Sequence, residues 1–221
     1  MVKGILFDLD GTLFDRDAAV GQLVFDQHVR FASVLADVPR DVYAARVLEL
    51  DAHGYGDKAD IYRQVVREFA LPDSLAPQLT ADFWRKYHAF CRPFPEVPSV
   101  LAALSSQGLK LGVVTNGSVQ IQEPVVSELG IAKLISVILV SEREGVRKPH
   151  PELFHRALRM LDLRPDEVWF VGDHPQVDVD GAAAAGLSAI WRRTPHWPAP
   201  TSLHRQLETL DELLVWIQCT A

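Results

Sequence analysis

The chain alternates short apolar runs of strand length with amphipathic stretches of helical length. The expected strands are at residues 4–8, 109–115, 134–140, 168–171 and 189–191. The expected helices between and after the later strands are at residues 119–129, 151–161, 177–185 and 211–218. Because strands that are apolar throughout are buried on both faces, this order predicts a parallel sheet with helices on each side.

Residues 16–92 follow a different pattern. Apolar side chains recur there at helical spacing, and strand signals are absent. We therefore predict an α/β fold: a Rossmann-like, doubly wound parallel sheet in a three-layer α/β/α core, with an inserted α-helical domain. The predicted core is residues 1–15 and 93–221, and the predicted insertion is residues 16–92.

Composition excludes several classes of protein. The 221 residues are 48% hydrophobic and carry a formal net charge of −7, which argues against a nucleic-acid or anionic-membrane partner. We expect no signal peptide, because Lys3 is followed within a few residues by Asp8 and Asp10 and not by a long apolar segment, and no uninterrupted apolar stretch is long enough to span a bilayer. The two cysteines, Cys91 and Cys219, fit no metal spacing and favour a reducing compartment, the cytoplasm.

The first apolar run ends in two carboxylates, Asp8 and Asp10, followed by a Gly-Thr turn. Buried carboxylates are costly unless they are paired or bound to a metal, so this strand end is a candidate site. The alternative is an ordinary turn at Asp10-Gly11 with Asp8 solvated at the end of the strand.

Two later strands also end in polar residues. Thr115 and Asn116 stand between a strand and a helix, where backbone amides and a helix N-terminus favour an anion. Asp173 follows another strand, and Asp178 lies five residues further on. The alternatives are that Asn116 or Ser118 caps a helix and that Asp178 only favours a helix N-terminus.

In a doubly wound sheet these strand ends meet in one crevice. Like charges about 4 Å apart repel by roughly 4 kcal/mol at an effective dielectric constant near 20, so clustered carboxylates need a cation. Oxygen ligands without His or Cys point to Mg²⁺. A loop lysine such as Lys148 is ordinarily solvated, but here it could balance the remaining negative charge.

Four segments together resemble the haloacid dehalogenase superfamily, in its phosphatase branch with a small helical cap after the first motif. They are Phe7–Thr12, Thr115–Gly117, Lys148-Pro149 and Gly172–Gly186. The resemblance implies a Mg²⁺-dependent phosphohydrolase that acts on a small phosphorylated metabolite. It also implies that residues 16–92 are the cap domain.

On this resemblance, Asp8 is the nucleophile that forms an aspartyl-phosphate, and Asp10 is the general acid and base. Asp8, the Asp10 backbone carbonyl and Asp173 are the expected ligands of Mg²⁺. The remaining roles are phosphate binding by Thr115, Asn116 and Lys148, and support of the metal site or of Lys148 by Asp178.

Asp10 favours phosphoester chemistry over carbon–halogen cleavage, because a halide leaving group needs no acid. A phosphomutase of the same superfamily and a non-catalytic sensor of a phosphorylated metabolite are the alternatives. The expected partner is a small phosphorylated substrate, and the expected state is a monomer or homodimer.

Specificity is expected to come from the cap. Arg16, His53 and Lys58 are candidates to contact the substrate, and the alternative for the last two is an exposed turn in which Asp57 caps the next helix.

Other conspicuous residues are expected to have structural roles. Arg192 and Arg193 are expected to be solvated, and Trp169 and Trp191 to belong to the core. The segment Pro195–Pro200 is expected to be a surface loop.

Overall fold

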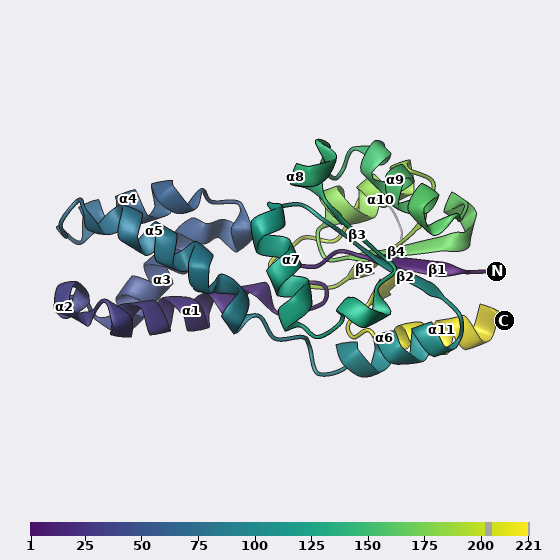
Figure 1. Cartoon of the computed structure of the whole chain (residues 1–221), viewed down its shortest axis with the longest axis horizontal. Helices are drawn as coiled ribbons and strands as arrows, with labels where there is room; N and C mark the ends of the chain where they lie inside the picture. The colour runs from purple at the N-terminus through teal and green to yellow at the C-terminus, as the bar shows by residue number, and fades with distance from the viewer. Residues whose placement is uncertain (202–204, 221) are drawn as a thin grey trace. The chain divides into compact units, whose positions relative to one another are not determined.

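The computed structural model describes residues 1–201 and 205–220, and it divides into two compact units. The core unit comprises Met1–Asp15 and Arg92–Ala221, and the helical unit comprises Arg16–Cys91. Figure 1 shows the helical unit, with helices α1 to α5, inserted after the first strand of the core unit.

The core unit contains a six-stranded parallel sheet with strand order β3-β2-β1-β4-β5-β6. The strands are β1 (Gly4–Phe7), β2 (Lys110–Thr115), β3 (Val137–Val140), β4 (Val168–Gly172), β5 (Ser188–Arg192) and β6 (Arg205–Leu207). In register, Phe7 of β1 lies between Val113 of β2 and Val171 of β4. The winding direction reverses between β1 and β4, which is where ligands bind in sheets of this kind.

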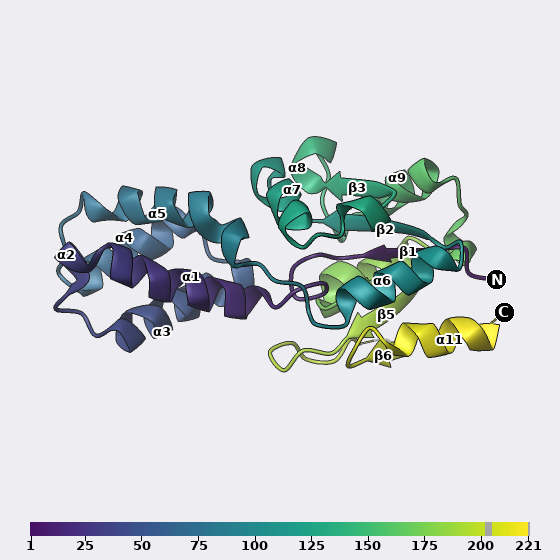
Figure 2. The same cartoon turned by 60° about the horizontal axis from the view of Figure 1, so that its bottom comes forward.

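Helices cover both faces of this sheet. They are α6 (Val97–Ser106), α7 (Val119–Glu128), α8 (Ser141–Glu144), α9 (Pro151–Leu161), α10 (Gly181–Ala184) and α11 (Glu212–Thr220). Figures 1 and 2 show α6 and α11 side by side on one face and α9 and α10 on the other. Over the residues described, no helix has both the length and the apolar character needed to cross a membrane.

Helix α9 shows how the sequence builds these layers. Pro151 stands in its first turn, where a missing N–H costs nothing, and the His150 side chain accepts a hydrogen bond from the Glu152 amide at 3.2 Å. Its buried residues recur along one stripe that packs against the sheet: Leu153, Phe154, Ala157, Leu158 and Leu161.

The helical unit consists of α1 (Arg16–Arg30), α2 (Ala32–Leu35), α3 (Arg40–Asp51), α4 (Lys58–Glu68) and α5 (Leu75–Lys86). A buried polar network joins four of these helices. The side-chain oxygen of Gln27, Oε1, accepts hydrogen bonds from the hydroxyls of Tyr43 and Tyr62, each at 2.8 Å. The Gln27 amide donates to Asp82 at 3.1 Å, so the buried polar groups satisfy one another.

The structure confirms the predicted fold class, with two local corrections. The predicted helix over 177–185 is instead a π-helical turn at Pro175–Asp180 followed by α10. Strand β6 was not predicted, because a three-residue segment with two exposed side chains carries no apolar pattern. Trp169 and Trp191 are buried, as expected.

Candidate active site

The candidate site lies where the two central strands of the core unit end. Asp8 directly follows β1, and its amide donates a hydrogen bond to the Val171 carbonyl of β4 at 2.9 Å. Asp173 directly follows β4. The side chains of both aspartates are buried, although each follows a strand that is apolar throughout.

Lys148 connects two of the acids. Its Nζ donates to Asp8 Oδ1 at 2.5 Å and to Asp178 Oδ1 at 2.7 Å, and the lysine is only 2% exposed. Burial by itself would lower the pKa of Lys148, but the carboxylates of Asp178 and Asp8 outweigh it and raise the pKa, so the ammonium stays charged.

The backbone of Lys148 is held by Asn116, the residue after β2. The Asn116 side-chain amide donates to the Lys148 carbonyl at 3.0 Å, and its Oδ1 accepts from the Lys148 amide at 2.9 Å. The Asn116 side chain therefore positions the lysine loop. The phosphate contact predicted for Asn116 stays a prediction.

Asp8, Asp173 and Asp178 form a buried acidic cluster whose ligand oxygens lie within 4.8 Å of one another. When all three carboxylates are ionised, the ammonium of Lys148 balances one of them and two negative charges remain. Burial raises the pKa of Asp8 and of Asp173; Lys148 counteracts part of this rise for Asp8 and His196 for Asp173, and the Asp178 carboxylate adds to it for both. A set of hard oxygen donors with two excess negative charges fits a divalent cation.

Asp10 is the second acid of the first motif, and it is held by Gln122 of α7. The Gln122 amide nitrogen donates to Asp10 Oδ2 at 2.8 Å and to the Asn116 carbonyl at 3.1 Å. Gln122 is not among the residues predicted from the sequence. The available signal was a glutamine on the buried stripe of a helix, beside Val125 and Val126.

Thr115 ends β2 next to these residues and is 1% exposed. Its hydroxyl has no hydrogen-bond partner among the residues described. Because a buried hydroxyl without a partner is costly, this atom is suited to a ligand that brings its own acceptor.

The comparisons with known proteins agree with this geometry. A family model for haloacid dehalogenase-like hydrolases matches residues 2–186. The chain belongs to this family.

A curated relative of this haloacid dehalogenase-like hydrolase is the glyceraldehyde 3-phosphate phosphatase of Methanopyrus kandleri. It is 29% identical over 210 residues, which are 86% of this chain and 83% of the relative. By homology with such phosphatases, the chain is a phosphoric monoester hydrolase.

Two solved structures resemble the whole chain. A magnesium-bound putative hydrolase of the family from Bacillus subtilis has a TM-score of 0.77 at 21% identity and covers 98% of both chains. A 2-haloacid dehalogenase from Pseudomonas syringae has a TM-score of 0.66 at 27% identity and covers 100% of both.

The three cap candidates of this hydrolase contact carboxylates inside the helical unit. Arg16 donates to both carboxylate oxygens of Asp51, at 2.6 and 3.1 Å, and Lys58 Nζ lies 2.6 Å from the same carboxylate. His53 Nδ1 lies 2.5 Å from an oxygen of Asp17. Their predicted contacts with substrate stay predictions.

The turn before α4 agrees with the alternative role given to Asp57. The Asp57 carboxylate accepts a hydrogen bond from the Asp60 amide at 3.0 Å and caps the helix. Lys58 is 5% exposed, so it does not belong to an exposed turn.

Arg192, at the end of β5, contradicts the prediction that it is solvated. It is 5% exposed, donates to the Thr12 carbonyl at 2.8 Å and to Glu96 at 3.2 Å, and its guanidinium lies 3.8 Å from the ring centre of Phe94. Arg193, the next residue, is exposed as expected.

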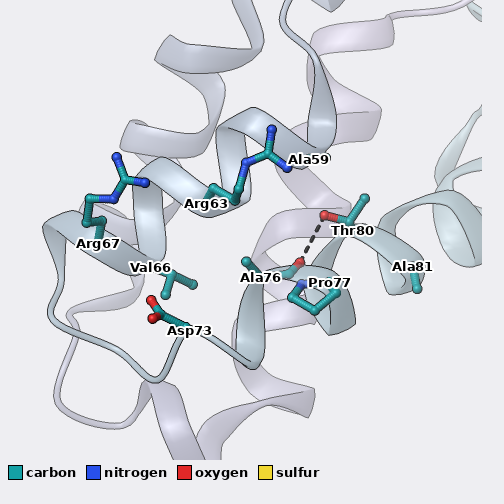
Figure 3. Close-up of a pocket in the computed structure, with 9 residues that line it drawn as sticks. All are labelled: Ala59, Arg63, Val66, Arg67, Asp73, Ala76, Pro77, Thr80 and Ala81. Atoms are coloured by element: carbon teal, nitrogen blue, oxygen red, sulfur yellow. Dashed lines mark hydrogen bonds between the residues drawn. The ribbon is translucent and has the colours of Figure 1, made fainter.

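The helical unit of the hydrolase also carries a cavity of about 610 Å³ that is distinct from the acidic cluster. Figure 3 shows it between α4 and α5, with Arg63 and Arg67 on one side and Ala76 and Pro77 on the other. No predicted site residue lines it.

Proposed function

We propose that the chain is a Mg²⁺-dependent phosphohydrolase that acts on a small phosphorylated metabolite through an aspartyl-phosphate on Asp8. The observation that carries this proposal is the buried cluster of Asp8, Asp173 and Asp178 around Lys148, at the point where the sheet reverses its winding. The family match and the phosphatase relatives support the same reaction class.

The residues that would hold Mg²⁺ are Asp8 and Asp173, through their carboxylates, and Asp10, through its backbone carbonyl. Asp178 supports the site from its place in the acidic cluster. When bound, the ion offsets the negative charge of the carboxylates and of the phosphate oxygens. The magnesium-bound relative from Bacillus subtilis supports this choice of metal.

In the first step, a carboxylate oxygen of Asp8 attacks phosphorus while the bond from phosphorus to the leaving oxygen breaks. The leaving oxygen takes a proton from the Asp10 carboxyl, so an alcohol departs and Asp10 becomes ionised. Lys148, already paired with Asp8, balances the charge of the incoming phosphoryl group. The Thr115 hydroxyl and the backbone amide of Asn116 are proposed to donate hydrogen bonds to the oxygens of the phosphoryl group.

In the second step, water attacks the phosphorus of the aspartyl-phosphate, and Asp10 takes the proton that the water releases. The bond from phosphorus to Asp8 breaks, which returns the carboxylate and releases inorganic phosphate. Asp10 is again protonated and ready for the next substrate.

Asp10 also separates this proposal from dehalogenation, the activity named for several similar structures. A halide leaves without a proton, so carbon–halogen cleavage does not use an acid at this position. We further propose that residues 1–15 and 93–221 are the catalytic core and that residues 16–92 are a cap domain. Within that cap, Arg16, His53 and Lys58 are proposed to select the substrate.

The test is a screen of the purified protein against phosphorylated sugars, nucleoside monophosphates and phosphoglycolate, scored by released phosphate with Mg²⁺ or with EDTA. A 2-haloacid arm, scored by released halide, runs in parallel. We expect Mg²⁺-dependent phosphate release and no halide. Halide release without phosphate release would overturn the proposal.

The matched variant is Asp8→Asn, which keeps the shape of the side chain and removes the nucleophile. We expect it to fold and to have no turnover. Near-normal phosphate release by this variant would show that Asp8 is not the nucleophile.

A further inference from the structure

The loop after β5 brings an aromatic side chain to the acidic cluster. The Trp197 indole nitrogen donates a hydrogen bond to Asp173 Oδ2 at 3.2 Å. His196, from the same loop, lies 3.8 Å from that oxygen. The segment Pro195–Pro200, expected to be only a surface loop, therefore reaches a candidate metal ligand.

Asp173 accepts two indole hydrogen bonds within the core unit, and Gly11 leaves space for its carboxylate. A second indole, that of Trp191, donates to its backbone carbonyl at 2.7 Å. Gly11 leaves room for its carboxylate, because a Cβ on Gly11 would lie 2.5 Å from Oδ2. Trp197 holds Oδ2 itself.

The Trp197 ring also packs against His174, whose backbone amide holds Asp178, the third carboxylate of the acidic cluster. The Trp197 ring lies 4.4 Å, centre to centre, from the ring of His174. The His174 ring accepts a hydrogen bond from the Val177 amide at 3.2 Å, and the His174 amide donates to Asp178 Oδ2 at 3.1 Å. The indole thus contacts Asp173 through its nitrogen and the Asp178 turn through its ring.

The sequence of this loop restricts the backbone on both sides of Trp197. Three prolines, at 195, 198 and 200, surround Trp197, and each proline fixes its own φ and restricts the residue before it. A side chain on a restricted backbone loses less conformational freedom when it makes a contact.

We propose that Trp197 is a positioning residue that orients the Asp173 carboxylate, so that Oδ2 stays engaged by the indole and Oδ1 is the oxygen offered to the cation. This inference rests on the metal site of the proposed function. Hydrogen-bond partners of metal-binding carboxylates set ligand orientation, and losing one typically weakens metal binding by about 10- to 100-fold.

The experiment measures Mg²⁺ binding by titration calorimetry on the metal-free protein. Trp197→Phe keeps an aromatic ring beside His174 and removes only the N–H, whereas Trp197→Ala removes both contacts. The matched control is Trp216→Phe, the same change on α11, where the indole packs on Trp169 instead.

We expect Trp197→Phe to weaken Mg²⁺ binding by about tenfold or more, Trp197→Ala to weaken it further, and Trp216→Phe to leave it unchanged. Excess Mg²⁺ should restore kcat of Trp197→Phe, with KM for the substrate unaltered. A residue that only stabilises the fold, or one that touches the substrate, would not give this rescue.

The outcomes separate this inference from the proposed function. If the wild type binds Mg²⁺ and Trp197→Phe binds it within twofold as tightly, the role of Trp197 is overturned and the metal site stands. If the wild type binds no Mg²⁺, both are overturned. If Mg²⁺ binding falls as expected but no phosphate is released from any substrate, only the reaction assigned to the site is overturned.

Discussion

The Gln122 amide nitrogen lies 2.8 Å from Oδ2 of Asp10, a contact between residues 112 positions apart. It joins α7 to the loop after β1, and the same nitrogen also reaches the Asn116 carbonyl at 3.1 Å. Gln122 therefore holds the proposed acid–base residue against the loop that positions Lys148.

Gln122→Ala should lower kcat by about 10- to 100-fold, because Gln122 would hold Asp10 in the ionised form that takes the proton from water, and a hydrogen bond to a charged group contributes about 1.5–3 kcal/mol. KM should change little, since the proposed phosphate contacts remain. Steady-state kinetics measure both constants. Gln120→Ala, an exposed glutamine on the same helix, is the control, and equal kinetics for the two variants would contradict the role given to Gln122.

Asp10→Asn should separate the two proposed chemical steps. With p-nitrophenyl phosphate the leaving group needs little protonation, so the first step should continue while water attack on the aspartyl-phosphate slows by about 10²- to 10⁴-fold. Rapid mixing should show one equivalent of nitrophenolate followed by a stall. With an alkyl phosphate both steps need Asp10, and no burst is expected; a burst with both substrates would remove Asp10 as the acid.

Because of Asp51, the stability of the helical unit should depend on pH in the acidic range. Burial would raise the pKa of Asp51, but Arg16 and Lys58 outweigh it and lower the pKa below its ordinary value of 3.8. The ion pairs therefore contribute stability above pH 3.8, and this contribution is lost as pH falls from 3.8 through the lower pKa of the folded state.

Asp51→Asn should lower the free energy of unfolding by about 3 kcal/mol at pH 7, because it leaves two partly or fully buried cations without their carboxylate. The deficit relative to wild type should shrink below pH 3.8. Urea unfolding across this pH range measures it. Asp37→Asn, at an exposed position, is the control, and a deficit that does not vary with pH would contradict the assignment.

Arg192 and Arg193 are adjacent, but Arg192 is buried and Arg193 is exposed, so the same substitution can be compared at both positions. Arg192→Met should destabilise the core unit by about 3–5 kcal/mol, since it leaves Glu96 and the Thr12 carbonyl without their buried donor. Arg193→Met removes an exposed pair with Glu208 and should cost about 1 kcal/mol or less. Equal unfolding midpoints for the two variants would contradict this difference.

The strand ends of the candidate site could be predicted from the sequence. Asp8 and Asp173 interrupt runs that are otherwise fully apolar, and a doubly wound sheet brings such ends together. The bounds of α9 could also be predicted, because burial of one side of a helix leaves apolar residues at regular helical spacing.

The supporting residues could not be predicted in the same way. Gln122 and Trp197 act on acids more than 20 positions away, at separations of 112 and 24 residues, and local patterns carry no information about such contacts. Arg192 is buried because the Thr12 carbonyl and Glu96 are distant in sequence and close in space. From its neighbours alone, a charged residue beside another arginine is expected to be solvated.

Position 11 is expected to accept no amino acid other than glycine. The Gly11 backbone has a φ of +76°, and a Cβ there would lie 2.5 Å from an oxygen of Asp173. Every other amino acid would be strained in this conformation and would also collide with the carboxylate. A saturation library at this codon, selected for function, should therefore return wild type alone, however freely the surrounding sequence is allowed to drift.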